Sequence, residues 1–150
     1  MIKTVYDPSD AAGILELGRQ FHQESHFRGT SYDEPKCRML MAASLMYPEK
    51  IFIAYDDTFQ GIIVLQMSTQ FFNDQKWAGD QAFYVTPQAR GSGLAKQLLD
   101  AGSQWAKQNG ASDLVIFHNA GIGIEKAEGF YNPLGFNLSG LIFNKSLVDN

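Results

Sequence analysis

The most informative segment for the fold of this chain is Val85-Thr86-Pro87-Gln88-Ala89-Arg90-Gly91-Ser92-Gly93-Leu94-Ala95. Before it, Gln81–Thr86 is predicted to be a strand that Pro87 ends. After it, apolar residues recur at helical spacing from Leu94 to Trp105. A further strand is predicted over Asp113–His118. Because a helix of this length cannot close a hairpin, the two strands must run parallel, which indicates an α/β fold.

The glycines of this stretch favour binding of an anion. Glycine lets the backbone approach a ligand closely, and the first turn of a helix presents free N–H groups to a phosphate or pyrophosphate. A Walker loop is excluded because Leu94-Ala95 replaces the required Lys and Ser or Thr. A dinucleotide fingerprint is excluded because Lys96 stands near the place of its third glycine. The loop chemistry alone leaves open a plain glycine-rich turn that starts a helix.

Two motifs together resemble a known family. Gln88-x-x-Gly91-x-Gly93, followed by Leu94-Ala95, resembles the acyl-coenzyme A motif of the GNAT N-acyltransferase superfamily. The second motif, Phe130-Tyr131-Asn132-Pro133-Leu134-Gly135-Phe136, resembles the Phe-Tyr-x-x-x-Gly-Phe element of that family. The resemblance covers Asp80 to Phe136, and the first half of the chain fits it in element order only.

The resemblance implies one domain over residues 1–150, with a twisted mixed α/β sheet of six or seven strands and about four helices. The strands ending at Val85 and His118 would splay into a V that receives the pantetheine arm of coenzyme A. The residues expected to bind acetyl-coenzyme A are the end of the first strand and the loop: Val85, Gln88, Arg90, Gly91, Ser92, Gly93, Leu94 and Ala95. Charge from Arg90 or Lys96 would assist the backbone N–H groups.

The resemblance also implies transfer of an acetyl group from acetyl-coenzyme A to a primary amine by direct attack in a ternary complex. The attacking amine must lose a proton, and Asp80 is the candidate base, with the start of a strand as its alternative role. Tyr131 is the candidate acid for the departing thiolate, with packing of a short helix as its alternative. The N–H of Val85 or Tyr84 would polarise the thioester carbonyl at a strand bulge. His118 is a weaker candidate, more simply explained as a residue that ends a strand.

The rest of the chain predicts a strand over Met1–Tyr6, a helix capped by Asp7, and a hairpin of Ile51–Tyr55 with Gly61–Met67. A helix over Asp33–Tyr47 is expected to bury its apolar side chains Met39, Leu40, Ala43 and Met46. Residues Asn73–Gly79 are expected to form a polar loop. A short helix is expected over Glu125–Asn132. The tail Phe136–Leu147 is expected to form one or two strands.

Composition narrows the function classes. The 150 residues are 45% hydrophobic and carry 12 basic and 16 acidic side chains, a formal charge of −4. This balance argues against nucleic acid as a partner. No apolar run approaches the about 18 residues of a membrane span, and no signal peptide is evident, so the cytoplasm is the expected compartment. One cysteine, Cys37, and the isolated pair His22 and His26 predict no metal site.

Two other functions remain open at this point. One is a GNAT-fold module that binds acyl-coenzyme A without turnover. The other is modification of DNA bases, since the short chain and the aromatic residues before Asp80 resemble phage-encoded members, although the acidic charge opposes it. A homodimer is among the assemblies the resemblance implies. The acceptor is not readable from the sequence.

Overall fold

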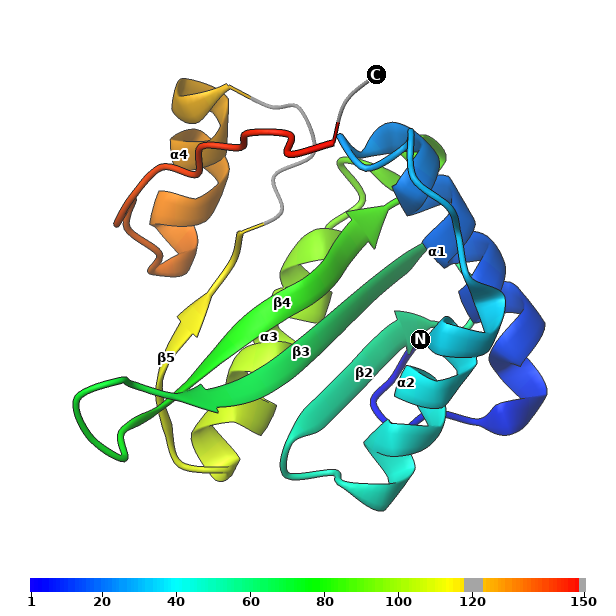
Figure 1. Ribbon diagram of the computed structural model, residues 1–150, viewed down its shortest axis with the longest axis horizontal. Coiled ribbons are helices and arrows are strands. Elements are labelled where there is room, and N and C mark those ends of the chain that lie inside the picture. The colour runs from blue at the N-terminus through cyan, green and yellow to red at the C-terminus, as the bar shows by residue number, and fades with distance from the viewer. Residues whose placement is uncertain (118–122, 149–150) are drawn as a thin grey trace. The chain divides into compact units, whose positions relative to one another are not determined.

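The computed structural model describes residues 1–117 and 123–148. The chain divides into two compact units, Met1–Ala120 and Gly121–Asn150. The first unit is built on one sheet with the strand order β1-β2-β3-β4-β5 (Figure 1). Its strands are β1 (Ile2–Lys3), β2 (Ile51–Asp56), β3 (Gly61–Thr69), β4 (Lys76–Val85) and β5 (Ala111–Val115). The pairs β1–β2, β2–β3 and β3–β4 are antiparallel, whereas β4 and β5 are parallel, as the crossover helix requires.

Helices cover both faces of this sheet (Figure 1). On one face α1 (Ala11–Glu24) and α2 (Glu34–Met46) enclose a core with the side chains of Ile62, Val64 and Tyr84. On the other face lies α3 (Leu94–Gln108). Helix α3 approaches β3 closely because glycine stands at Gly102, where a Cβ would lie 2.8 Å from Leu65 Cδ1.

The helix ends follow from local sequence. Asp7 caps a 3-10 turn over Pro8–Asp10 that leads into α1, and its carboxylate accepts from the Ser9 N–H at 2.9 Å. Asp33 caps α2 in the same way through the Lys36 N–H, at 3.1 Å. Gly110 ends α3 with φ of +85°, the left-handed conformation that favours glycine.

Three expectations about the first unit need correction. Helix α2 buries Met41 and Ser44, whereas Met39 and Met46 are 72% and 70% exposed, so the predicted apolar face was wrong. Residues Lys76–Gly79, predicted to lie in a loop, begin β4 and pair with both neighbouring strands. Strand β1 is shorter than predicted, because the chain leaves β2 after Lys3.

The second unit contains α4 (Ile124–Tyr131), which confirms the predicted short helix, and a 3-10 turn over Asn132–Leu134. The described part of the tail, residues 136–148, contains no strand, so the prediction of one or two strands there was wrong. Its large apolar side chains are mostly exposed, with Phe143 at 89%. The described sheet therefore has five strands rather than six or seven.

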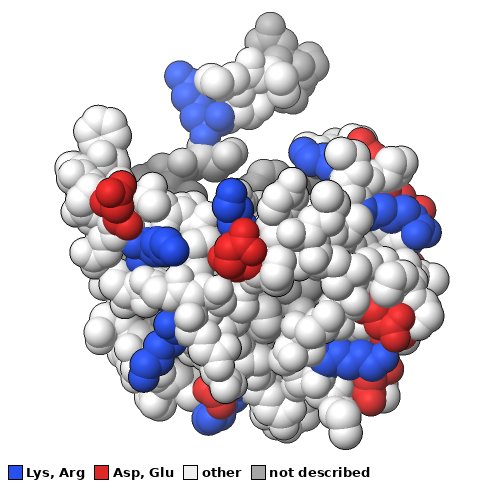
Figure 2. Space-filling view, turned by 90° about the horizontal axis from the view of Figure 1, so that it is seen from below, with Lys and Arg blue, Asp and Glu red and all other residues white. Residues whose placement is uncertain are grey.

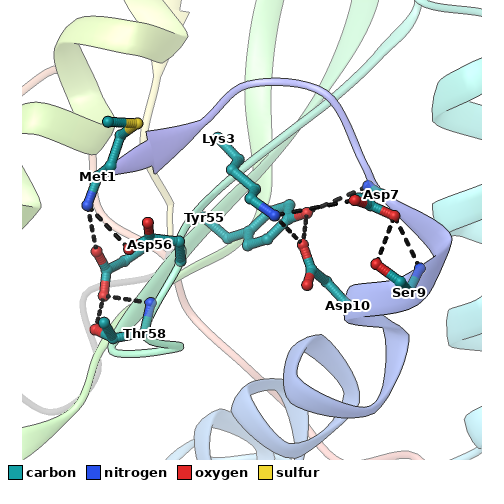
Figure 3. Close-up of polar contacts among 9 residues, drawn as sticks. Met1, Lys3, Asp7, Ser9, Asp10, Tyr55, Asp56 and Thr58 are labelled. Atoms are coloured by element: carbon teal, nitrogen blue, oxygen red, sulfur yellow. Dashed lines mark hydrogen bonds and ion pairs between the residues drawn. The ribbon is translucent and has the colours of Figure 1, made fainter.

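A polar network ties β1 to the start of α1 (Figure 3). The buried Tyr55 hydroxyl donates to Asp10 Oδ2 at 2.6 Å and accepts from the Asp7 N–H at 3.2 Å. Lys3 Nζ donates to the same Asp10 oxygen at 2.7 Å. These bonds hold the pKa of Asp10 below its ordinary range, first through Lys3 and then through Tyr55.

Asp10 is therefore expected to make the fold sensitive to acid. The folded state binds the Asp10 proton less tightly than the unfolded chain does, so its contribution is present above a pH of about 4 and is lost as the pH falls further. Urea unfolding at pH 7 and pH 3 should show a smaller loss of stability on acidification for Asp10→Asn than for the unchanged protein. Asp74→Asn, on the exposed β3–β4 loop, is the control. An equal acid loss in Asp10→Asn and the unchanged protein would contradict this assignment.

Candidate active site

The glycine loop lies between β4 and α3 and combines two left-handed residues. Gly91 and Gly93 have φ of +82° and +87°, a region that side-chain-bearing residues rarely adopt. A Cβ built at either glycine meets no atom within 4 Å. The space in front of the loop is therefore open.

Several backbone N–H groups of this loop and of the first turn of α3 have no acceptor among the described residues. The N–H groups of Gly91, Gly93, Ala95 and Lys96 find no acceptor in the parts of the chain that the structure describes. The first regular helical bond of α3 runs from the Gln97 N–H to the Gly93 carbonyl, at 3.1 Å. Such a set of donors at a helix N-terminus suits an oxyanion or a pyrophosphate.

The other predicted loop residues have distinct positions. Leu94 is buried beneath the loop against Gly61 of β3, and Ala95 is half-buried. The Ser92 hydroxyl donates to the Ala89 carbonyl, which fixes the turn before the helix. The Gln88 side chain is exposed. Leu94 therefore supports the loop from below, while Gln88 and Ser92 lie at its surface.

Arg90 is held by the protein itself. Its guanidinium donates through Nε to the Val85 carbonyl at 3.1 Å and forms an ion pair with Glu24 at the end of α1, at 2.7 Å. The Tyr84 hydroxyl donates to the other Glu24 oxygen at 3.1 Å. Burial, and then the charge of Glu24, raise the pKa of Tyr84 to about 12. Arg90 thus connects the glycine loop to α1. Lys96, the other expected cation, pairs with Asp100 on the exposed side of α3.

The Glu24 charge gives a test of this network. Glu24→Gln should lower the pKa of Tyr84 toward its ordinary value of about 10, with burial keeping it somewhat above that value. Spectroscopic titration of the tyrosines, with Tyr84→Phe to identify the signal, measures the shift. Glu16→Gln removes a carboxylate from the same helix, where it pairs with Arg19, and should leave the titration unchanged. An unchanged Tyr84 pKa in Glu24→Gln would show that burial alone raises it.

Strands β4 and β5 pair over only part of β4. The pairing runs from Lys76 opposite Ala111 to Gly79 opposite Val115, and β4 continues to Val85 with no further partner on this side among the described residues. The two strands therefore form the open end of the expected V. A bulge at Gln81 lies near the point where the pairing stops, because Leu65 pairs with Asp80 and Val64 with Ala82. The bulge is not at Tyr84 or Val85, where the sequence placed it; these two residues pair regularly with Ile62 and Gly61.

Asp80 lies where β4 and β5 stop pairing. It is 2% exposed, and its Oδ1 accepts the Phe117 N–H at 2.6 Å. Since β4 begins at Lys76, Asp80 lies inside the strand and not at its start. The carboxylate thus connects β4 to the segment that follows β5, at the base of the V, and Asp80 is one of the residues around a pocket with Gln66, Trp77 and Gln81.

Tyr131 belongs to the second unit and ends α4. Its ring packs edge-on against Phe130 and Phe136, with centroids 4.9 and 5.4 Å away. The Phe136 N–H donates to the Tyr131 carbonyl at 3.1 Å, and Gly135, with φ of +92°, makes the turn between them. The second motif is therefore a local aromatic cluster closed by a glycine. His118 lies outside the described residues.

More than half of the chain matches a known protein family. Residues 48–138 match the family profile described as an acetyltransferase (GNAT) domain, and this match spans both motifs. The chain belongs to the GNAT acetyltransferase family. No curated protein matches the sequence significantly.

Solved structures agree with the GNAT fold. An acetyltransferase of Trypanosoma brucei is 19% identical, with a TM-score of 0.70 over 98% of this chain and 99% of its own. A glucosamine-6-phosphate N-acetyltransferase of Arabidopsis thaliana is 16% identical, with a TM-score of 0.71 over 99% of each chain. An aminoglycoside acetyltransferase from an uncultured soil sample, solved with sisomicin, is 13% identical, with a TM-score of 0.73 over 100% of this chain and 96% of its own. At these identities the likeness establishes the fold alone.

The charged surface of this GNAT protein is relevant to nucleic acid as a possible partner. On the face drawn in Figure 2, basic and acidic side chains lie beside one another among uncharged surface, so this face carries no continuous basic patch. Within the described ranges, no group of three His, Cys, Asp or Glu residues is arranged to hold a metal ion. No helix of the described chain has the length and apolar character needed to cross a membrane.

Sequence reasoning missed two sets of residues in this GNAT site. The Glu24–Tyr84 pair was missed because Glu24 lies far from the glycine loop in the sequence. Trp77 was assigned to a loop because Gly79 and Lys76 are weak strand formers. The apolar alternation of Trp77 with Gly79 on one face and Ala78 on the other was the available signal.

Proposed function

We propose that this protein transfers an acetyl group from acetyl-coenzyme A to a primary amine by direct attack in a ternary complex. The observation that carries the proposal is the glycine loop, whose free N–H groups and open space suit a pyrophosphate. Family membership supports acetyltransferase activity in general. A metal ion has no role in the proposal.

The loop residues and the edge of β4 are proposed to bind different parts of acetyl-coenzyme A. The N–H groups of Gly91, Gly93 and Ala95 would hold the pyrophosphate, with Arg90 available if it leaves Glu24. The edge of β4 from Asp80 to Val85 has no partner strand within the described residues on the β5 side. An arm that contains amide groups can add to such an edge, as a further strand does. This supports placing pantetheine between β4 and β5.

Two side chains are proposed for proton transfer. Asp80 would take the proton of the attacking ammonium through a water molecule, because its carboxylate is short and is already oriented by the Phe117 N–H. Tyr131 would donate a proton to the departing thiolate. Its role is supported by the motif around it, Phe130 to Phe136.

Tyr131→Phe tests the second role. Loss of the hydroxyl should lower kcat by about 10- to 100-fold and leave the affinity for acetyl-coenzyme A unchanged, because the ring contacts with Phe130 and Phe136 persist. Steady-state kinetics with release of free thiol measures this. Tyr47→Phe, on an exposed tyrosine after α2, is the control. A kcat within twofold of the unchanged protein would remove Tyr131 from the mechanism.

Calorimetric titration with acetyl-coenzyme A tests the proposal as a whole, with desulfo-coenzyme A and NAD as comparison ligands. One-to-one binding of both coenzyme A compounds and none of NAD is expected. Release of thiol on addition of an amine then establishes turnover. Binding without turnover over a broad amine panel would favour a non-catalytic binding module, and no binding by the folded protein would leave the loop as a structural turn.

A further inference from the structure

The side chain of Arg90 occupies a backbone acceptor at the end of β4. Its Nε donates to the Val85 carbonyl at 3.1 Å. The Thr86 N–H donates to the Gln60 carbonyl on the β3 side, and in the trans peptide before Thr86 the carbonyl points the opposite way. The Val85 carbonyl therefore faces the β5 side, which is the edge proposed to receive the pantetheine arm. An amide N–H of that arm would need the acceptor that Arg90 now uses.

The second partner of Arg90 lies where helix stability does not favour its charge. Glu24 is the last residue of α1, and a carboxylate there meets the negative end of the helix dipole. Its Oε2 accepts from Arg90 Nη2 at 2.7 Å, and its Oε1 accepts from the Tyr84 hydroxyl at 3.1 Å. The contacts with the glycine loop and β4, and not the helix, therefore stabilise the charge at this position.

The ion pair between Arg90 and Glu24 is open to exchange. The two side chains are 53% and 35% exposed, and an exposed pair of this kind changes an equilibrium by about fivefold at most. A pyrophosphate carries more charge than one carboxylate, and its oxygens can accept two parallel N–H bonds from a guanidinium. The phosphates of a cofactor at the glycine loop would therefore be a stronger partner for Arg90 than Glu24 is.

We propose that Glu24 sets the affinity for acetyl-coenzyme A, because its carboxylate competes with the phosphates of the cofactor for Arg90. This inference rests on the proposed function. In the free protein Arg90 connects the glycine loop to the end of α1. Binding of the cofactor transfers the guanidinium to the phosphates and leaves the Val85 carbonyl to the pantetheine arm. Glu24 then keeps the Tyr84 hydroxyl as its partner, and its link to the glycine loop is broken.

Glu24→Gln tests the competition. The amide oxygen of glutamine can still accept from the Tyr84 hydroxyl, whereas the charge that holds Arg90 is lost. Calorimetric titration with desulfo-coenzyme A should show an affinity about three- to fivefold higher than that of the unchanged protein. Glu16→Gln removes a partner of Arg19 on the same helix and should leave this affinity unchanged. An unchanged or lower affinity in Glu24→Gln would overturn the proposal.

A double-mutant cycle separates this competition from simple repulsion between Glu24 and the phosphates. Arg90→Gln should weaken binding of desulfo-coenzyme A about tenfold, because a charge-assisted contact with the phosphates is lost. In the Arg90→Gln background, Glu24→Gln should raise the affinity by less than about twofold, since no guanidinium remains to be released. An equal increase in both backgrounds would show that Glu24 acts by repulsion and would overturn the role of Arg90.

The Nε–H group of Arg90 gives a direct signal of the transfer. Its resonance in a proton–nitrogen NMR spectrum is identified by its loss in Arg90→Gln. Saturation with desulfo-coenzyme A should shift this resonance, because the N–H leaves the Val85 carbonyl, and should leave the resonance of Arg19 in place. An Arg90 resonance that stays unshifted at saturation would overturn the proposal.

These measurements distinguish the fate of this inference from that of the proposed function. The expected coupling between Glu24 and Arg90, without thiol release on addition of amines, would support the competition and refute acetyl transfer. Acetyl transfer without any coupling in the cycle would refute the competition alone. Absence of binding by the folded protein would refute both.

Discussion

Gly93→Val should abolish binding of acetyl-coenzyme A while the protein stays folded. The added side chain would occupy the open space in front of the Gly91, Gly93 and Ala95 N–H groups, where no protein atom lies within 4 Å of a Cβ at Gly93. Because φ at this position is +87°, the substitution also costs about 1–2 kcal/mol in backbone strain. Calorimetric titration should show at least a 100-fold loss of affinity.

The chain offers a matched control for the strain. Gly110, at the opposite end of α3, has φ of +85° and equally open surroundings. Gly110→Val should therefore lower the melting temperature as much as Gly93→Val does and bind acetyl-coenzyme A normally. Unchanged binding in Gly93→Val would show that the loop does not hold the pyrophosphate, and equal loss in both variants would show that the effect comes from the stability of α3.

Asp80→Asn should reduce kcat by about 10²- to 10⁴-fold. The amide oxygen of asparagine can still accept the Phe117 N–H, so the connection between β4 and the segment that follows β5 persists while the base is lost. The affinity for acetyl-coenzyme A should be unchanged. Asp80→Ala should in addition lower the free energy of unfolding by about 1–3 kcal/mol, because the partly buried Phe117 N–H loses its acceptor.

Asp56→Asn is the control for Asp80→Asn. Asp56 is also buried, at 8% exposed, and binds the Met1 ammonium and the Thr58 N–H at the far edge of the sheet. Its substitution should lower stability and leave kcat within about twofold, since it removes no group proposed for proton transfer. If Asp80→Asn retains kcat within twofold, Asp80 serves only to join β4 to the segment that follows β5.

The predictions that succeeded rest on patterns within single elements. The hairpin of Ile51–Tyr55 with Gly61–Met67 is confirmed because β-branched runs flank a short polar turn. The buried face of α3, from Leu94 to Trp105, is confirmed because its apolar residues recur at helical spacing. The parallel pair β4–β5 is confirmed because a crossover helix permits no other direction.

The predictions that failed depend on contacts between segments that are distant in the sequence. Helix α2 has apolar side chains around most of its surface, so its sequence did not specify that Met41 rather than Met39 faces the sheet. The tail after Phe136 has strand-forming residues, but a strand exists only where another strand pairs with it, and none is assigned in residues 136–148. Lys76, Ala78 and Gly79 have weak strand propensity, and Lys76–Gly79 become a strand through pairing on both sides.

Local sequence was enough to predict the glycine loop, the strand-helix-strand unit around it and the aromatic motif of Tyr131, because turns, caps and helical periodicity depend on neighbouring residues. The folded structure was needed to show that Arg90 pairs with Glu24, that Asp80 accepts the Phe117 N–H and that the rings of Trp77 and Phe117 pack edge-on. These contacts join residues that are 66, 37 and 40 positions apart. Such contacts form when packing of the whole sheet brings distant segments together, and no local pattern records them.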